Sequence, residues 1–197
     1  MIEALGVAAI GAVLTAAAVQ DLKSREIDAR IFAAGALPAA LLIALNWGSP
    51  LYLFSLGVAA ALALLMRLLG SGYADSISMA LIGAAPPPLP FLPTPFVAVM
   101  AGSALLPAHI AYLYLKNRKR PCEMTLAERL THICVSIEEF RRSPLKYVVG
   151  DVRDMERYDP STLELRDRWI KAKYGLPYVV YLAAGYWAYV AIWLLPK

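Results

Sequence analysis

Six apolar stretches run along the chain, and most are separated by short turns. A bilayer core of roughly 30 Å needs a helix of about 20 mostly apolar residues, and most of these stretches approach that length. They cover residues 1–20, 31–47, 51–69, 75–89, 96–115 and 175–195. The pattern predicts an all-α membrane protein with six transmembrane helices.

Small residues and prolines distinguish individual stretches. Stretch 1–20 is rich in Gly and Ala, which allow helices to approach closely in lipid, so we expect an interior helix there. Stretch 75–89 is short because prolines at its end stop a helix early. Pro107 lies inside stretch 96–115 and predicts a kink.

Residues 116–173 differ from the rest of the chain because they are rich in charge. Thr125 and Glu128 form one capping-box pattern, which predicts a helix from Thr125 to about Arg142. This segment is expected to be a small cytoplasmic α/β subdomain between the fifth and sixth helices. The predicted division is therefore 1–115 for five helices, 116–173 for the subdomain and 174–197 for the last helix.

Two shorter patterns lie within the same polar segment. Ser161 and Glu164 form a second capping box. Residues 145–149 are apolar and β-branched or aromatic at several positions, which predicts a short strand.

The composition limits the chemistry. Hydrophobic residues make up 59% of the 197 residues, more than in a typical soluble domain. The two cysteines, Cys122 and Cys134, are too few for a disulfide framework or a four-cysteine zinc site, so we expect a structural role. Of the two histidines, His109 is expected to pack within the fifth helix and His132 to lie on the surface of the predicted helix.

Basic residues indicate the orientation. All 19 Lys and Arg except Lys197 lie in or beside the loops after the first, third and fifth stretches. Basic loops stay in the cytoplasm, so we expect a multi-pass protein of the cell membrane with both termini outside. No basic run carries interleaved aromatic residues, and nucleic acid is not an expected partner.

Two aspartates stand at the boundaries of apolar stretches on the predicted cytoplasmic side. Asp21 follows the first stretch and Asp75 opens the fourth, and a carboxylate is costly to bury there. Two adjacent carboxylates share a proton, so one can take a proton from water while the other polarises a carbonyl group. Gly72 could let a substrate backbone approach. From composition alone, Asp21 could equally be a loop residue and Asp75 a simple helix cap.

The two motifs resemble those of a known family. Residues 21–27 (DLKSREI) together with 72–75 (GYAD) look like the active-site motifs of type IV prepilin peptidases, particularly the archaeal preflagellin peptidase branch of the GxGD membrane aspartic proteases. Ala74 stands where many members have a second glycine. Asp28 and Ala29 stand where bacterial members often have Pro and Asn.

The resemblance implies an activity and a partner. It implies an aspartic endopeptidase whose catalytic residues are Asp21 and Asp75, acting without metal or cofactor on the short basic leader of preflagellins or prepilins. Glu26, Asp28 and Gly72 are the candidate substrate-binding residues, the two acids because the leader is basic. Bacterial bifunctional members carry a cytoplasmic domain with two CxxC pairs, which this sequence lacks. We therefore expect no N-methyltransferase activity.

Other functions stay open at this stage. A GxGD protease for other membrane substrates is the nearest, although such enzymes carry a Tyr-Asp motif and here Gln20 precedes Asp21. A transporter or proton channel could use the two aspartates as a cation site, but related halves are not evident. A third alternative is a non-enzymatic protein that binds pilins during assembly. Only an activity assay can distinguish it from a peptidase. The oligomeric state is not predicted.

Overall fold

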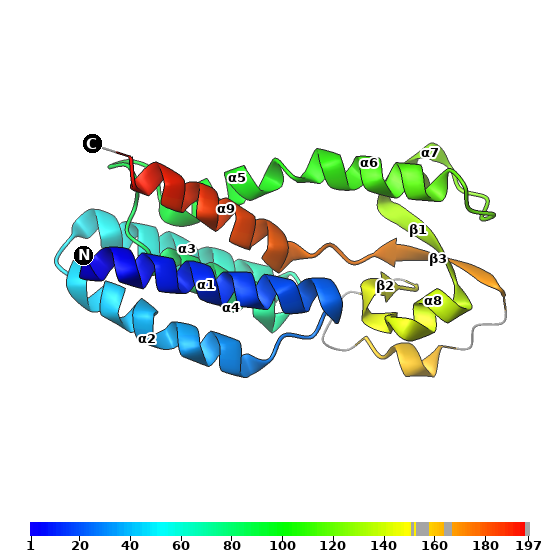
Figure 1. The fold of residues 1–197 in the computed structure, drawn as a ribbon, viewed down its shortest axis with the longest axis horizontal. Coiled ribbons are helices and arrows are strands. Elements are labelled where there is room, and N and C mark those ends of the chain that lie inside the picture. The colour runs from blue at the N-terminus through cyan, green and yellow to red at the C-terminus, as the bar shows by residue number, and fades with distance from the viewer. Residues whose placement is uncertain (151, 153–157, 164–166, 196–197) are drawn as a thin grey trace. The chain divides into compact units, whose positions relative to one another are not determined.

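The computed structural model of the chain describes residues 1–150, 152, 158–163 and 167–195 (Figure 1). These residues are mostly helical and include one small sheet. They divide into two compact units. We call Met1–Ala104 with Pro177–Lys197 the helical unit, and Leu105–Leu176 the sheet unit. The boundaries predicted after residues 115 and 173 both fall inside the sheet unit.

The helical unit contains the long helices of the N-terminal half of the chain and one helix from the C-terminal end. Its described helices are α1 (Ile2–Lys23), α2 (Ala29–Asn46), α3 (Pro50–Leu68), α4 (Tyr73–Gly83), α5 (Thr94–Ser103) and α9 (Tyr178–Trp193). Helices α1 and α2 lie side by side, and α9 packs against both α1 and α5 (Figure 1).

Four helical segments are long and apolar enough to cross a membrane. They are α1, α2, α3 and the segment Thr94–Asn117. Helix α4 has 11 residues and α9 has 16, and 11 residues of helix rise only about 17 Å. Length and composition therefore support four of the six predicted spans and do not by themselves support the other two.

The kink predicted at Pro107 is present as a break in the helix. Helix α5 ends at Ser103, and α6 begins at Leu106 with Pro107 in its first turn. Proline has no N–H to donate and fits the first turn of a helix, where that donor is not needed.

The outer faces of the long helices are apolar. Several large apolar side chains of α2 and α3 are more than half exposed. They include Leu37, Leu45, Phe54, Leu64 and Leu68. Soluble monomers rarely expose so much large apolar surface, whereas lipid solvates it well. The exposed positions agree with the membrane character that the helix lengths indicate.

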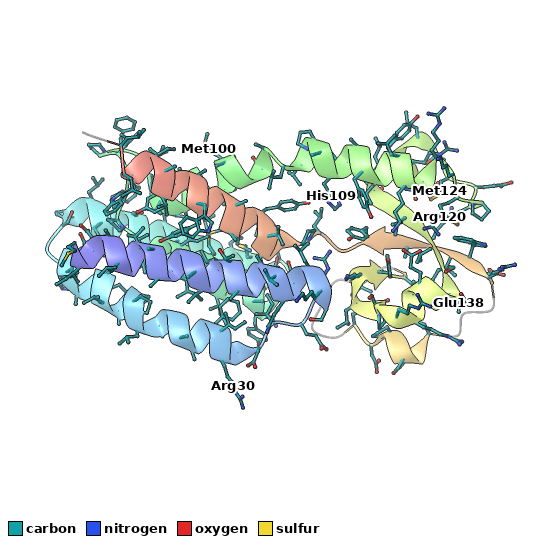
Figure 2. The ribbon with its side chains drawn as sticks, in the orientation of Figure 1. Arg30, Met100, His109, Arg120, Met124 and Glu138 are labelled. Carbon is teal, nitrogen blue, oxygen red and sulfur yellow. A yellow bond between two sulfur atoms is a disulfide. The ribbon has the colours of Figure 1, made fainter. Side chains whose placement is uncertain are left out.

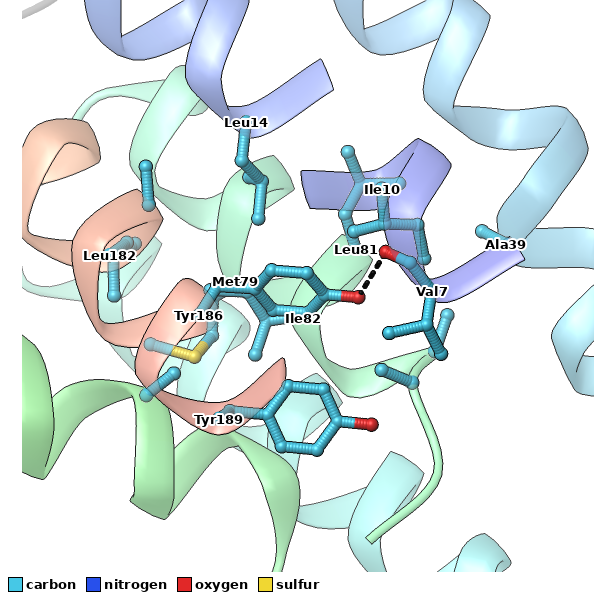
Figure 3. Close-up of a cluster of buried hydrophobic side chains, with 14 of the residues drawn as sticks. Val7, Ile10, Leu14, Ala39, Met79, Leu81, Ile82, Leu182, Tyr186 and Tyr189 are labelled. Carbon is cyan, nitrogen blue, oxygen red and sulfur yellow. Dashed lines mark hydrogen bonds between the residues drawn. The ribbon is translucent and has the colours of Figure 1, made fainter. Parts of the chain in front are cut away.

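Buried tyrosines tie α9 into the core of the helical unit. The Tyr186 hydroxyl donates a hydrogen bond of 2.9 Å to the carbonyl oxygen of Val7 (Figure 3). The Tyr189 hydroxyl donates one of 2.8 Å to that of Pro86. Both rings are fully buried among the apolar side chains of α1 and α4. Because each hydroxyl finds an acceptor, burying it costs little.

Helices α5 and α9 approach each other most closely where glycines lie between them. A Cβ atom added to Gly185 would overlap the carbonyl oxygen of Ala98, and one added to Gly102 would overlap that of Tyr181. Small residues at an interface are typical of helices that pack inside a membrane. This packing fixes the position of α9, whose first turn is part of the candidate site described below.

The sheet unit contains short elements. They are α6 (Leu106–Asn117), α7 (Leu126–Thr131), β1 (His132–Ser136), α8 (Ile137–Arg142), η1 (Pro144–Lys146), β2 (Tyr147–Val148), η3 (Pro160–Thr162) and β3 (Trp169–Tyr174). The sheet has the strand order β1-β3-β2, and both pairs are antiparallel.

The single helix predicted from Thr125 to about Arg142 is wrong. Helix α7 ends at Thr131, the strand β1 follows, and α8 starts only at Ile137. Ile133 and Val135, both completely buried, lie in β1 and pair with residues of β3, more than thirty positions further along the chain. Pairing with so distant a strand outweighs the local helical pattern.

The capping box at the start of that segment is confirmed. The Thr125 hydroxyl accepts a hydrogen bond from the N–H of Glu128, and the Glu128 carboxylate accepts one from the N–H of Thr125 at 2.7 Å. This backbone hydrogen bond, together with Lys171 at 2.9 Å, lowers the pKa of Glu128 to about 2. The reciprocal bonds define where α7 begins.

The other two patterns of the polar segment have different outcomes. The predicted strand at 145–149 is present in part, as β2 after the short helix η1. The second predicted capping box, between Ser161 and Glu164, stays a prediction because Glu164 lies outside the described residues. Next to it, the Asp159 carboxylate caps η3 by accepting a hydrogen bond from the N–H of Ser161 at 2.9 Å.

The two cysteines form a disulfide that the sequence did not predict. Cys122 and Cys134 are joined, with their Cα atoms 5.7 Å apart. The N–H of Cys134, in β1, also donates a hydrogen bond of 3.0 Å to the buried side chain of Asn117 at the end of α6. The expected structural role is therefore present, as a cross-link that holds the segment before α7 against the sheet.

The packing role expected of His109 agrees with the structure, whereas the helical position expected of His132 is wrong. The His109 ring lies 5.4 Å from that of Tyr174 and 6.3 Å from that of Tyr112. Figure 2 marks the position of His109. These are packing distances for aromatic rings. His132 opens β1 instead of lying on a helix, and its Nδ1 atom is 2.8 Å from the Thr131 hydroxyl.

Candidate active site

The C-terminus of α1 ends in an unusual turn at Arg25. Arg25 has φ 63°, in the left-handed region. Its N–H donates a hydrogen bond of 3.2 Å to the carbonyl oxygen of Asp21. This arrangement is the left-handed helix cap, in which glycine or asparagine usually stands because a larger side chain is disfavoured there. The turn folds the Arg25 side chain back over the last turn of α1.

The side chain of Asp21 is buried at this turn. The residue is 8% exposed, and its Oδ1 atom lies 3.3 Å from Nη1 of Arg25. No described residue donates a hydrogen bond to the other oxygen, Oδ2, which is also buried. One oxygen of Asp21 is therefore held by a cation, and the other can accept a hydrogen bond from water or from a substrate.

The loop after Asp21 is anchored at both ends. Oε1 of Gln20 accepts a hydrogen bond of 2.8 Å from the N–H of Asp28, and Oδ1 of Asp28 accepts one of 2.9 Å from the N–H of Arg30. Asp28 is thus the N-cap of α2. Glu26 and Asp28 are exposed, and Arg30 projects away from the helices (Figure 2).

The second motif follows a regular helix ending. Gly70 has φ 85°, and its N–H donates to the carbonyl oxygen of Arg67 while that of Ser71 donates to Met66. These two bonds form a Schellman motif, which favours glycine at this position. The Arg67 guanidinium donates to the Ser71 carbonyl oxygen at 3.1 Å and lies 4.2 Å from the centre of the Tyr73 ring. The loop that leads to Asp75 is therefore well defined.

Asp75 lies in the first turn of α4 and is partly exposed. The N-cap of α4 is Gly72, so Asp75 is not the simple N-cap that composition allowed. Gly72 has φ −61°, which any residue can adopt. The conformational freedom of glycine is thus used at Gly70, and the backbone of Gly72 does not require a glycine.

The two aspartates reach the same turn of a third helix. The backbone N–H of Val179 lies within interaction range of the Asp21 carboxylate, and Asp75 interacts electrostatically with Tyr178. Tyr178 and Val179 are consecutive residues in the first turn of α9, where free N–H groups and the helix dipole favour negative charge. Helices α1, α4 and α9 also pack against one another. Both aspartates thus have neighbours in the first turn of α9.

Sequence reasoning missed four residues at or beside this site. Arg25 is four residues after Asp21, a spacing at which opposite charges meet on a helix, and that spacing could have identified it. Tyr178 and Val179 lie about one hundred residues further along than Asp75, so local patterns could not connect them with it. Ser78, one turn after Asp75, is fully buried, and its hydroxyl has no partner among the described residues.

A separate cavity lies at the other end of α1. It has a volume of about 440 Å³ and neither aspartate contributes to it. Its lining includes Glu3, Asn46, Tyr52 and Trp193. Among the residues that the structure describes, no group of three or more His, Cys, Asp and Glu side chains is placed to hold a metal ion.

The chain was compared with protein-family models, with curated proteins and with solved structures. None of the three comparisons finds a match.

Proposed function

We propose that the chain is a membrane-embedded aspartic endopeptidase that removes the short basic leader from preflagellins or type IV prepilins at the cytoplasmic membrane face. One observation carries this proposal: Asp21 and Asp75, from different helices, lie near consecutive residues of one turn of α9. The likeness of both motifs to those of the archaeal preflagellin peptidase branch supports it from the sequence.

The proposed chemistry needs only the two carboxylates and a water molecule. Two nearby carboxylates share one proton over a range of pH. The ionised one takes a proton from water as the water oxygen attacks the scissile carbonyl carbon, and the protonated one donates a hydrogen bond to the carbonyl oxygen. Breakdown of the tetrahedral intermediate returns the proton to the leaving nitrogen. The product is a leader with a new carboxylate and a pilin with a new amino terminus.

The proposed topology has six membrane-spanning segments. In addition to the four long helical segments, α4 with the uncharged segment that follows it and α9 would complete the bundle. The turns at 46–50 and 86–95 carry no charge, whereas nearly all basic residues fall in or beside the segments that follow the first, third and fifth proposed spans. By the positive-inside rule this side faces the cytoplasm, with both termini outside.

The position of Asp21 favours a peptidase over a channel. Lys23 and Ser24, which follow it closely, are exposed. A substrate segment outside the bilayer can therefore reach the end of α1, whereas a cation pathway needs charged groups along the membrane interior.

The direct test is cleavage of a preflagellin-type substrate by membranes that contain the protein. The substrate carries a basic leader before an apolar helix, and a matched substrate has alanine in place of each leader lysine and arginine. We expect the first to shorten on a gel, with its new terminus identified by mass spectrometry, and the second to be cut poorly. A wild-type protein that inserts correctly but cuts neither substrate would contradict the peptidase function. It would favour the transporter or the assembly protein instead.

Removing the acidic charge beside Asp21 is expected to weaken leader binding. We expect the double variant Glu26→Gln with Asp28→Asn to raise KM for the basic leader several-fold while leaving kcat nearly unchanged, since each exposed charge pair contributes about 0.2–1 kcal/mol. Asparagine is chosen at position 28 because it still caps α2. The assay is cleavage at several substrate concentrations.

The control for this experiment is Glu3→Gln, which removes one negative charge at the opposite end of α1. It should leave KM unchanged. Equal KM values in the double variant and the wild type would show that the two acids do not hold the leader.

A further inference from the structure

The ion pair between Arg25 and Asp21 is buried, although it stands at a helix end beside an exposed loop. The Arg25 side chain is 7% exposed and that of Asp21 is 11% exposed. Arginine is rarely buried to this degree unless it is paired. A pair in such surroundings interacts much more strongly than an exposed pair, because water screens it little.

The backbone shows that Arg25 holds this position against its local preference. At φ 63° the left-handed conformation is disfavoured for any residue with a Cβ atom. Such strain persists only where other interactions offset it. The Arg25 guanidinium contacts the Asp21 carboxylate, with Nη1 3.3 Å from Oδ1. The strained turn and the buried ion pair together place a guanidinium on Asp21.

The other charged groups near Asp21 are placed differently. On its own segment, Lys23 and Glu26 are exposed. Asp28 and Arg30 at the start of α2 are also exposed. Helix α4 presents Asp75.

Among the described residues, neither α9 nor α3 places a second cationic side chain against Asp21. Helix α9 presents Tyr178, and the described residues of α9 include no charged side chain. Arg67 of α3 contacts Ser71 and Tyr73.

We propose that Arg25 is a positioning residue that keeps Asp21 ionised, so that Asp21 is the base that takes the proton from water. The proton shared by the pair then lies on Asp75, which donates a hydrogen bond to the scissile carbonyl oxygen. Asp21 later passes the proton from water to the leaving nitrogen, so protons balance over the cycle. This assignment rests on the proposed peptidase function.

The proton assignment can be measured without any cleavage assay. Dicyclohexylcarbodiimide reacts with protonated carboxyl groups in apolar surroundings and leaves ionised ones unmodified. Membranes containing the wild type, Arg25→Met, Arg25→Lys or Lys23→Met would be treated near neutral pH, and the label would be located by peptide mass spectrometry. Lys23→Met is the matched control because it removes the same charge from an exposed side chain two residues away.

We expect label on Asp75 and little on Asp21 in the wild type and in Lys23→Met. In Arg25→Met the labelling of Asp21 should rise about tenfold or more, because an adjacent cation commonly alters the protonated fraction of a carboxyl group by at least this factor. Arg25→Lys should restore most of the wild-type pattern. Equal labelling of both aspartates in the wild type, or no change in Arg25→Met, would overturn the assignment.

A pH profile of cleavage separates this inference from the proposed function. The acidic limb of the profile should move by about one pH unit or more toward higher pH in Arg25→Met, because the carboxylate loses its adjacent cation, and should stay in place in Lys23→Met. If the wild type cleaves the substrate but the acidic limb of its pH profile is the same in Arg25→Met, the proposed role of Arg25 is rejected. The proposed peptidase function is then unaffected. A wild type that never cuts would reject the proposed peptidase, whatever the labelling shows.

Discussion

Asp21→Asn and Asp75→Asn are each expected to reduce cleavage of a preflagellin-type substrate by about 10³-fold or more. Each substitution keeps the size of the side chain but removes the carboxyl group that takes or holds a proton in the proposed mechanism, and such groups contribute factors of about 10² to 10⁴. Because the proposed mechanism uses the two carboxylates as a unit, the double variant should lose little more activity than either single variant. The measurement is the rate of the gel shift with membranes of matched protein content.

The matched control is Asp167→Asn, the same substitution at an exposed position of the sheet unit. It should cleave at the wild-type rate. Near wild-type activity in either active-site variant, with expression and insertion equal to the control, would make that aspartate structural and remove it from the site.

Gly185→Ala is expected to destabilise the helical unit by about 3 kcal/mol or more, a large part of the stability of a typical domain. The added Cβ would overlap the carbonyl oxygen of Ala98 and lie 2.8 Å from the backbone nitrogen of Gly102. Backbone atoms cannot rotate away as a side-chain end can, so α5 and α9 must separate. The readout is the thermal unfolding midpoint of the detergent-solubilised protein.

Gly57→Ala is the matched control for this substitution. Gly57 lies within α3, and an added Cβ would meet no atom within 4 Å. Alanine favours a helix over glycine by up to about 1 kcal/mol, so this variant should be equal to the wild type or slightly more stable. A midpoint for Gly185→Ala that matches Gly57→Ala would contradict the close packing of α5 and α9.

Local patterns predicted the elements of the candidate site but not their meeting point. Asp21 and Asp75 were identified because each carboxylate stands at the boundary of an apolar stretch, which sequence shows directly. The place where they gather, the first turn of α9, depends on the packing of α9 against α1 and α5. That packing uses Gly185 and Tyr186, which in the sequence are unremarkable members of an apolar run.

The sheet unit shows the limits of local patterns more clearly. The capping box at Thr125 was predicted correctly because both of its partners lie within four residues. The strand β1 was missed because it is stabilised by pairing with β3, which is distant in the sequence. In that pairing Ile133 lies opposite Ala172 and Val135 lies opposite Ile170. Helix length was also misjudged: the predicted stretch from Asp75 to residue 89 contains a helix that already ends at Gly83.

The disulfide between Cys122 and Cys134 can be compared with the compartment in which the proposed topology places it. The proposed topology places both sulfur atoms in the cytosol, where ordinary cells keep thiols reduced. Intracellular proteins of hyperthermophilic archaea and bacteria, by contrast, are often rich in disulfides. The bond and the topology are therefore compatible in an organism that grows at very high temperature, and in a mesophile free thiols in protein taken from native membranes would be expected instead.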